Sequence, residues 1–197
     1  MEGNAETALV TLEQTATSGL TLATDATDAT DATEAFGGPA AYRRRMRFDD
    51  FHAGQRITGG PYRVSEGEVL AFARQYDPQW FHTAAAAAAH GPFEGLIASG
   101  WHTCAIAMRL AVDAVLWGSE SYASPGISGI RWPHPVRPGD ELAFVATVLE
   151  VRRSRSGLGV LRWRWQLFNQ CGTEVLDLES TSLFRIQAPS AGFPAMA

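Results

Sequence analysis

The sequence predicts an α+β domain in which one long apolar helix is followed by a run of long strands. Residues 96–117 are mostly small and apolar. Beyond residue 126 the apolar residues alternate with polar ones, and this spacing is typical of strands that are buried on one face. One buried helix followed by antiparallel strands is an α+β pattern, and a curved sheet wrapped around the helix satisfies it.

Boundary signals support several of the predicted elements. Ser65 is followed three residues later by Glu68, which is the capping-box pattern of a helix start. That helix is expected to end at Asp77, because the residue before a proline avoids the α conformation. In chain order, the prediction is a lead-in and turn at 51–57, a strand at 61–64, helices at 65–77, 83–89 and 99–117, and strands at 126–132, 141–153, 157–168 and 173–186.

The 197 residues are enough for one ordinary domain and its tails. We predict a single domain over residues 48–186. Residues 1–40 contain an acidic Ala-Thr-Asp repeat and few large apolar residues. Such a segment buries too little surface to offset its ordering entropy, so we expect a disordered tail. Residues 187–197 are expected to form a loose C-terminal tail. The arginine-rich segment 43–47 is interpreted as a solvated edge, with phosphate binding as the alternative.

The composition is that of a soluble globular protein, with 46% hydrophobic and 19% charged residues. The net charge of −5 disfavours a nucleic-acid partner. Arg109 and Asp113 make a membrane span over residues 96–117 costly, and they are expected to pair because they lie one helical turn apart. Cys104 and Cys171 belong to no CxxC pair, and we expect a protein of the reducing cytoplasm.

The candidate catalytic pair is Asp77 and His82, which stand five residues apart. Their ordinary pKa values are roughly 3.9 and 6.5, so they can divide general base and general acid work near neutral pH. The start of the central helix, Ser99-Gly100-Trp101, offers backbone N–H groups to a developing oxyanion. These parts are what is needed to add water to, or remove it from, a double bond conjugated to a carbonyl.

Each candidate also has a purely structural interpretation. Without His82, Asp77 would be interpreted as a turn cap. Ser99 alone is an N-cap, and no Gly-x-Ser-x-Gly motif surrounds it to make it a nucleophile. His90 and His102 are interpreted as structural histidines that make local hydrogen bonds. The spacing of the histidines fits no metal-ligand motif, so no metal is expected.

Three segments together carry a family resemblance: Phe72–His82, Gly95–Thr103 and Arg131–Asp140. In these segments the chain resembles the MaoC-like dehydratases, a hot-dog-fold family that includes the (R)-specific enoyl-CoA hydratases. The resemblance covers residues 48–186. It implies a curved antiparallel sheet around a long helix, and a dimer with active sites near the subunit interface. A homodimer, or a higher homo-oligomer of dimers, also agrees with the need to cover open sheet edges.

The catalytic motif of that family is Asp, any residue, Asn-Pro, any residue, His. Asp77 and His82 match its spacing, but Pro78 follows the aspartate directly, and Gln79 and Trp80 stand at the Asn-Pro positions. The departure affects the expected substrate more than the expected reaction. Trp80 is bulky, so we expect it to reshape the acyl site.

The resemblance implies a hydratase or dehydratase that acts on the α,β double bond of an acyl thioester in fatty acid metabolism. Asp77 and His82 would share one water molecule, and the N–H groups of Gly100 and Trp101 would stabilise the enolate-like oxygen. The substrate carrier would be CoA or acyl-carrier protein, with no further cofactor. Arginines suit the phosphates of such a carrier. The candidates are Arg131, Arg137 and Arg152–Arg155.

Two other functions remain open at this point. One is a non-catalytic module that binds acyl thioesters or serves as a heterodimer partner, although the presence of both Asp77 and His82 favours activity. The other is a hot-dog thioesterase, in which a carboxylate near the central helix activates water toward the thioester carbonyl. Acyl chain length, the direction of the reaction and the identity of the base are not decided by the sequence.

Overall fold

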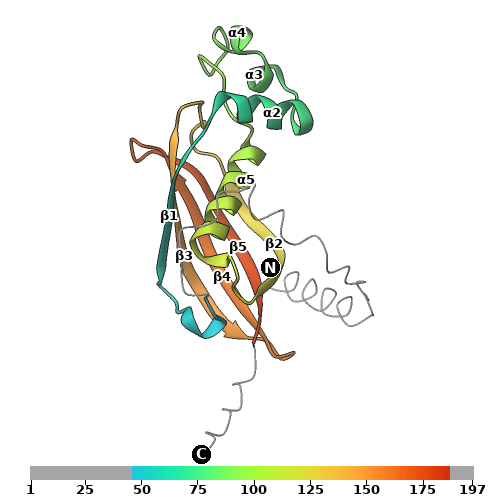
Figure 1. The fold of residues 1–197 in the computed structure, drawn as a ribbon, viewed down its shortest axis with the longest axis vertical. Helices are drawn as coiled ribbons and strands as arrows, with labels where there is room; N and C mark the ends of the chain where they lie inside the picture. The colour runs from blue at the N-terminus through green and yellow to red at the C-terminus, as the bar shows by residue number, and fades with distance from the viewer. Residues whose placement is uncertain (1–45, 187–197) are drawn as a thin grey trace, which may run out of the picture. The chain divides into compact units, whose positions relative to one another are not determined.

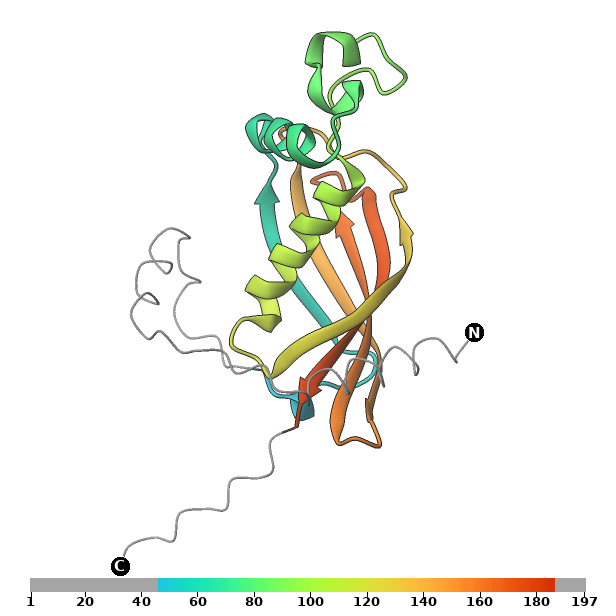
Figure 2. The same cartoon turned by 90° about the vertical axis from the view of Figure 1, so that its right-hand side faces the viewer.

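The structure, a computed structural model, describes residues 46–186, and these form an antiparallel sheet with a long helix against one face (Figures 1 and 2). The tails predicted at residues 1–40 and 187–197 lie outside the described residues, as does most of segment 43–47. The strands pair in the order β1-β3-β4-β5-β2. They are β1 Arg56–Arg63, β2 Ser121–Arg131, β3 Glu141–Arg153, β4 Leu158–Phe168 and β5 Glu174–Arg185.

The helices are concentrated at one end of the sheet and along one face. In chain order they are the 3-10 helix η1 Phe48–Asp50, the α-helices α2 Glu66–Tyr76, α3 Trp80–Thr83, α4 Ala85–Ala88 and α5 Gly100–Ala111, and the π-helical turn η2 Val112–Leu116. In Figure 1, α2, α3 and α4 lie together at the end of the sheet from which α5 starts. The predicted α+β architecture is confirmed.

The predicted N-terminus of α2 is confirmed in detail. The Ser65 hydroxyl accepts a hydrogen bond from the Glu68 N–H at 3.2 Å and donates one to the Glu68 carboxylate at 3.2 Å. The helix ends at Tyr76, and Asp77 is its C-cap, as expected for the residue before a proline. The element that carries Asp77 therefore has both ends set by local sequence.

The predicted strands of the C-terminal half lie within a few residues of the observed ones, but β1 and β2 are longer than predicted. β1 begins at Arg56, inside the predicted turn, and a register shift between Gly59 and Tyr62 lets the strand carry Gly-Gly-Pro. β2 begins at Ser121, with a register shift between Ala123 and Gly126. Both are edge strands of the described sheet, where proline and irregular pairing are tolerated.

Two helices also differ from the prediction. The helix expected over 83–89 is shorter, as α4 over Ala85–Ala88, and a separate helix α3 over Trp80–Thr83 comes before it; Ala84, with φ of −124° and ψ of 86°, is not helical and divides the two. The central helix keeps α geometry only to Ala111 and then widens into the π-helical turn η2.

The core lies between α5 and the sheet. On α5 the buried face includes Ile106, Ala107 and Leu110, and the facing strand β4 buries alternate residues. Trp163 and Trp165 are buried in this core with their rings edge to face at 5.2 Å. The long helix is thus held along its length by apolar contacts.

The predicted ion pair joins α5 to η2 on their exposed side. Arg109 Nε lies 2.8 Å from Asp113 Oδ2, one helical turn away. Among the helices of residues 46–186, none is long and apolar enough to cross a membrane.

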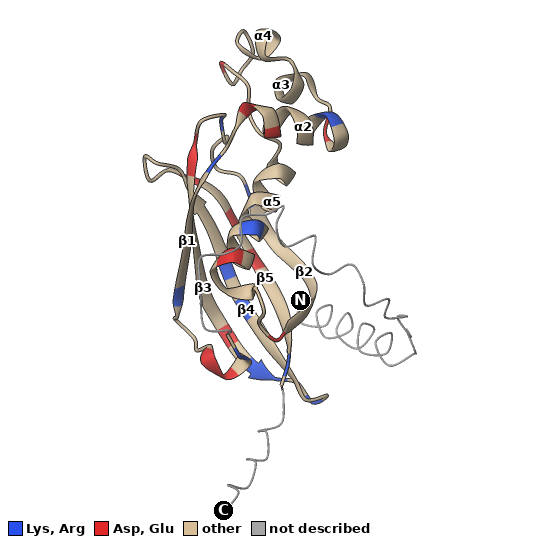
Figure 3. Ribbon diagram, viewed as in Figure 1, with Lys and Arg blue, Asp and Glu red and all other residues tan. Residues whose placement is uncertain are grey.

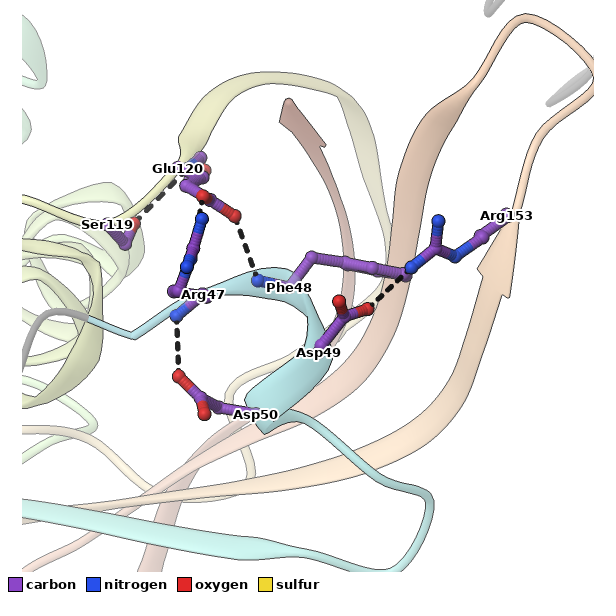
Figure 4. Close-up of polar contacts among 8 residues, drawn as sticks. Arg47, Phe48, Asp49, Asp50, Ser119, Glu120 and Arg153 are labelled. Carbon is purple, nitrogen blue, oxygen red and sulfur yellow. Dashed lines mark hydrogen bonds and ion pairs between the residues drawn. The ribbon is translucent and has the colours of Figure 1, made fainter. Parts of the chain in front are cut away.

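The first described residues are fastened at the end of the sheet opposite α2–α4 (Figures 1 and 4). Glu120 accepts hydrogen bonds from the Phe48 N–H at 3.1 Å and from Arg47 Nε at 3.2 Å. The Phe48 ring covers Gly159 so closely that a Cβ there would lie 2.3 Å from it. The hairpin between β3 and β4 lies at this same end, away from α2–α4 (Figure 1).

Candidate active site

Three elements bring the predicted site residues together. Asp77 is the C-cap of α2, His82 lies in α3, and Ser99 is the N-cap of α5. The turn from α2 to α3 is closed by a hydrogen bond from the Gln79 N–H to the Asp77 carbonyl at 2.8 Å. The C-terminal end of one helix therefore meets the N-terminal end of another at the Asp77 side chain.

Both oxygens of the Asp77 carboxylate are engaged. The Ser99 hydroxyl donates to Oδ2 at 2.7 Å, and the Gln79 amide donates to Oδ1 at 2.7 Å. His82 Nε2 lies 3.4 Å from Oδ2. The hydrogen bond from Ser99, then that from Gln79, and the nearby imidazole hold the pKa of Asp77 below its ordinary value, against the opposing effect of burial. Asp77 is therefore ionised at neutral pH.

His82 is held in one orientation by a backbone carbonyl. The ring is 5% exposed, and its Nδ1 lies 2.8 Å from the Ile97 carbonyl oxygen. Because a carbonyl only accepts hydrogen bonds, Nδ1 must carry the proton. Nε2, which faces Asp77, is then the nitrogen that gains or loses a proton.

The helical segment around His82 is free of charge. From Pro78 to Phe93 the sequence has no Asp, Glu, Lys or Arg, and α3 and α4 are accordingly tan throughout in Figure 3. The Asp77 carboxylate at the start of this segment is thus the charge that faces the imidazole.

The start of α5 offers one free amide rather than two. The Trp101 N–H donates to the Ser99 hydroxyl at 3.3 Å, so the N-cap already uses it. The Gly100 N–H makes no hydrogen bond with any residue of the 46–186 segment. Of the two predicted oxyanion donors, Gly100 is therefore the available one.

The Trp132 indole covers Gly100, which explains why this position is a glycine. A Cβ at this position would lie 2.6 Å from the Trp132 ring, which also meets Trp101 edge to face at 5.8 Å. The Trp101 side chain is 57% exposed. Sequence reasoning did not single out Trp132, although it lies in the Arg131–Asp140 segment that carries the resemblance.

Trp80 turns toward α4 and the turn after it. Its six-membered ring lies over Gly91, where a Cβ would be 2.5 Å away, and it contacts Phe81 edge to face at 5.4 Å. The side chain is 46% exposed. Its expected effect on the acyl site stays a prediction.

The other two histidines differ from each other. His90 makes the expected local hydrogen bond, with Nδ1 3.1 Å from the Ala86 carbonyl oxygen. His102 does not, because its buried Nδ1 has no hydrogen-bond partner among residues 46–186. Its ring instead stacks on Phe72 of α2, with centroids 4.8 Å apart and planes 10° apart, and burial lowers its pKa. In the described part of the chain, no group of three His, Cys, Asp or Glu residues is arranged to hold a metal.

The arginines expected to meet carrier phosphates fall into two groups. The hairpin that contains Arg152–Arg155 lies at the far end of the sheet from α2–α4 (Figure 1). Arg131 ends β2 near the start of α5, but it forms an ion pair with the buried Asp177. Arg137 donates to the Phe93 carbonyl oxygen at 2.5 Å. Both arginines near the site are therefore already engaged within the chain.

A family model for the MaoC-like domain matches residues 50–161. The chain belongs to the MaoC-like domain family. It is also 31% identical over 140 residues to the uncharacterized protein YdeM of Bacillus subtilis (strain 168), a match that covers 71% of this chain and 99% of YdeM. The matched residues of the family model include the three segments on which the resemblance was based.

Solved structures support the hot-dog fold of this MaoC-like protein. A MaoC-like dehydratase from Rhodospirillum rubrum is 37% identical, with a TM-score of 0.66 over 71% of this chain and 97% of that one. The R-hydratase PhaJ1 of Pseudomonas aeruginosa is 24% identical, with a TM-score of 0.59 over 76% of this chain and 94% of that one, a likeness of fold alone. The predicted family and the predicted hot-dog fold are confirmed.

Proposed function

We propose that this MaoC-like protein is a hydratase or dehydratase that acts on the α,β double bond of an acyl thioester. The observation that carries the proposal is the meeting of Asp77 and His82 at the N-terminus of α5, with 3.4 Å between Oδ2 and Nε2. Family membership and the similarity to a MaoC-like dehydratase support it.

In the proposed hydration, the pair acts on one water molecule. One of the two groups takes a proton from the water, whose oxygen bonds to the β-carbon while the double-bond electrons move toward the thioester carbonyl. The enolate oxygen so formed faces the Gly100 N–H. A proton from the pair then reaches the α-carbon, and dehydration runs the same steps in reverse.

The chemistry of the two groups suits this division of work. Asp77 is held ionised by two donated hydrogen bonds, so it accepts a hydrogen bond from water at neutral pH. His82 is held by the Ile97 carbonyl, so its exchanging proton is confined to Nε2, next to Asp77. Both groups therefore present their reactive atoms to the same point.

We propose a homodimer, or a higher homo-oligomer of dimers, as the assembled form. β2 is an edge of the described sheet, and apolar side chains lie exposed on it and on α5. They include Ile127, Trp101 and Met108. Pairing of edge strands from two copies would cover them. The substrate carrier is proposed to be CoA or acyl-carrier protein.

The test is a panel of enoyl-CoA thioesters of differing chain length, followed by the loss of conjugated absorbance and by a thiol reagent. Loss of absorbance without thiol release supports the proposal. Thiol release would identify a thioesterase instead. Binding of the thioesters without either signal would identify a non-catalytic module.

A further inference from the structure

The group that orients His82 is itself part of an irregular segment. The Ile97 carbonyl, which accepts from His82 Nδ1, belongs to the connection between α4 and α5. The Ile97 N–H donates to the Phe81 carbonyl at 3.3 Å, so this connection runs directly beside α3. Movement of the connection would therefore move the hydrogen-bond acceptor of the imidazole.

The connection is fastened to the loop between β2 and β3 at two points. The Ala98 N–H donates to the Val136 carbonyl at 2.8 Å. The Arg137 guanidinium donates through Nη2 to the Phe93 carbonyl at 2.5 Å. These contacts lie on either side of Ile97, so the position of its carbonyl depends on both.

Gly95 permits the approach of the Arg137 side chain. Its φ is 151°, which favours glycine, and a Cβ there would lie 3.1 Å from Arg137 Nη1. The guanidinium thus lies against the backbone of the connection, with no side chain between them.

The backbone of Arg137 is fixed in turn by a buried carboxylate. Asp140 is buried and accepts the Arg137 N–H at 2.8 Å and the Gln170 amide at 3.1 Å. The Asp140 carbonyl accepts from the Val64 N–H at 2.8 Å, just before α2 begins. The Arg137 side chain therefore extends to the connection from a backbone that is held by hydrogen bonds.

We propose that Arg137 is a positioning residue for His82. By holding the Phe93 carbonyl it fixes residues 93–98, and through the Ile97 carbonyl it keeps the imidazole proton on Nδ1 and Nε2 toward Asp77. This inference rests on the proposed hydratase function. It differs from the role that the resemblance implies for Arg137, which is contact with a phosphate of the carrier.

The two roles predict different kinetics for Arg137→Met. The variant is compared on an enoyl-CoA and on the same acyl group carried by N-acetylcysteamine, which has no phosphate. A positioning role predicts that kcat falls by ~10–100-fold on both thioesters with KM little changed, because misplacement of a catalytic group lowers the rate of the chemical step. A phosphate contact predicts that KM rises on the CoA thioester alone.

Two further variants separate charge from geometry. Arg63→Met removes an exposed arginine near the same end of the sheet. Arg63 lies 3.8 Å from the carboxylate of Glu141, which is also exposed, so the substitution should leave kcat and KM unchanged on both thioesters. Arg137→Lys keeps the charge but loses the planar guanidinium. Because its ammonium can still donate to the Phe93 carbonyl, the positioning role predicts a smaller fall of kcat than for Arg137→Met, again on both thioesters. This variant takes the place of Arg137→Met if that one does not fold.

Nitrogen NMR of the His82 ring tests the inference without any turnover. In the wild type we expect the Nδ1-protonated form, and in the Arg137 variants a mixture of both neutral forms. Unchanged His82 signals, or a loss confined to KM on the CoA thioester, would overturn the inference. If the wild type hydrates no thioester, the proposed function fails, whereas the ring signals still decide whether Arg137 positions His82.

Discussion

Replacing Ser99 with alanine removes one hydroxyl that serves two helices at once. The hydroxyl donates to Asp77 at the end of α2 with a distance of 2.7 Å, and it accepts from the Trp101 N–H at the start of α5 with a distance of 3.3 Å. Loss of an N-cap costs about 0.5–2 kcal/mol, and loss of a hydrogen bond to a charged group about 1.5–3 kcal/mol. Because one group makes both contacts, we expect the free energy of unfolding at pH 7 to fall by about 2–3 kcal/mol.

The pH dependence identifies the part of this cost that belongs to Asp77. The folded-state pKa of Asp77 is depressed, first of all by Ser99, so its contribution is present above the ordinary pKa near 3.8 and is lost as the pH falls through the folded value. In Ser99→Ala the depression is smaller. The stability difference between wild type and variant should therefore be largest near neutral pH and should shrink below about pH 3.8.

Urea unfolding at several pH values measures this effect, and Ser65→Ala is the matched control. Ser65 also caps a helix by accepting an N–H at 3.2 Å, but it lies at the other end of α2 from Asp77. Ser99→Ala should lower hydration as well as stability, whereas Ser65→Ala should lower stability alone. Equal costs for the two variants at every pH, with equal activities, would refute this account of Ser99.

Three further predictions concern the site and its supports. Asp77→Asn and His82→Ala should each lower hydration by about 10²–10⁴-fold with folding intact, measured by absorbance and circular dichroism. Gly100→Ala should displace the indole that covers it and cost about 1–3 kcal/mol in thermal unfolding, whereas Gly67→Ala, where a Cβ meets nothing within 4 Å, should not destabilise α2. His102→Phe should keep the ring stack and the stability at pH 7. Burial lowers the pKa of His102, so the wild type should lose stability relative to this variant as the pH falls below about 6.5, because the unfolded chain then binds a proton that the folded chain does not.

The regular elements of the fold could be predicted because their signals are local. The N-cap of Ser65 on the Glu68 N–H and the alternation over β3 each lie within one element, and both agree with the structure. The full lengths of β1 and β2 could not be predicted in this way. Gly59-Gly60-Pro61 and Pro125-Gly126 have the composition of turns, and only pairing with the neighbouring strand keeps them extended.

In the candidate site, too, local features could be predicted from the sequence and contacts made by the fold could not. Asp77 and His82 could be found from their spacing, because the sequence itself gives the type of each side chain. The Ile97 carbonyl could not, because every residue has a carbonyl and only the fold brings this one to His82. The hydrogen bond between Ser99 and Asp77 spans 22 residues and likewise depends on how α2 meets α5.

The central claim is that Asp77 and His82 act as one unit on a single water molecule, and a double-mutant cycle on hydration tests it most directly. Groups that act as a unit are strongly non-additive, so the variant carrying both Asp77→Asn and His82→Ala should be about as slow as the slower single variant. If the losses of the two single variants multiply in the double variant, the two groups act independently and the proposed mechanism is contradicted.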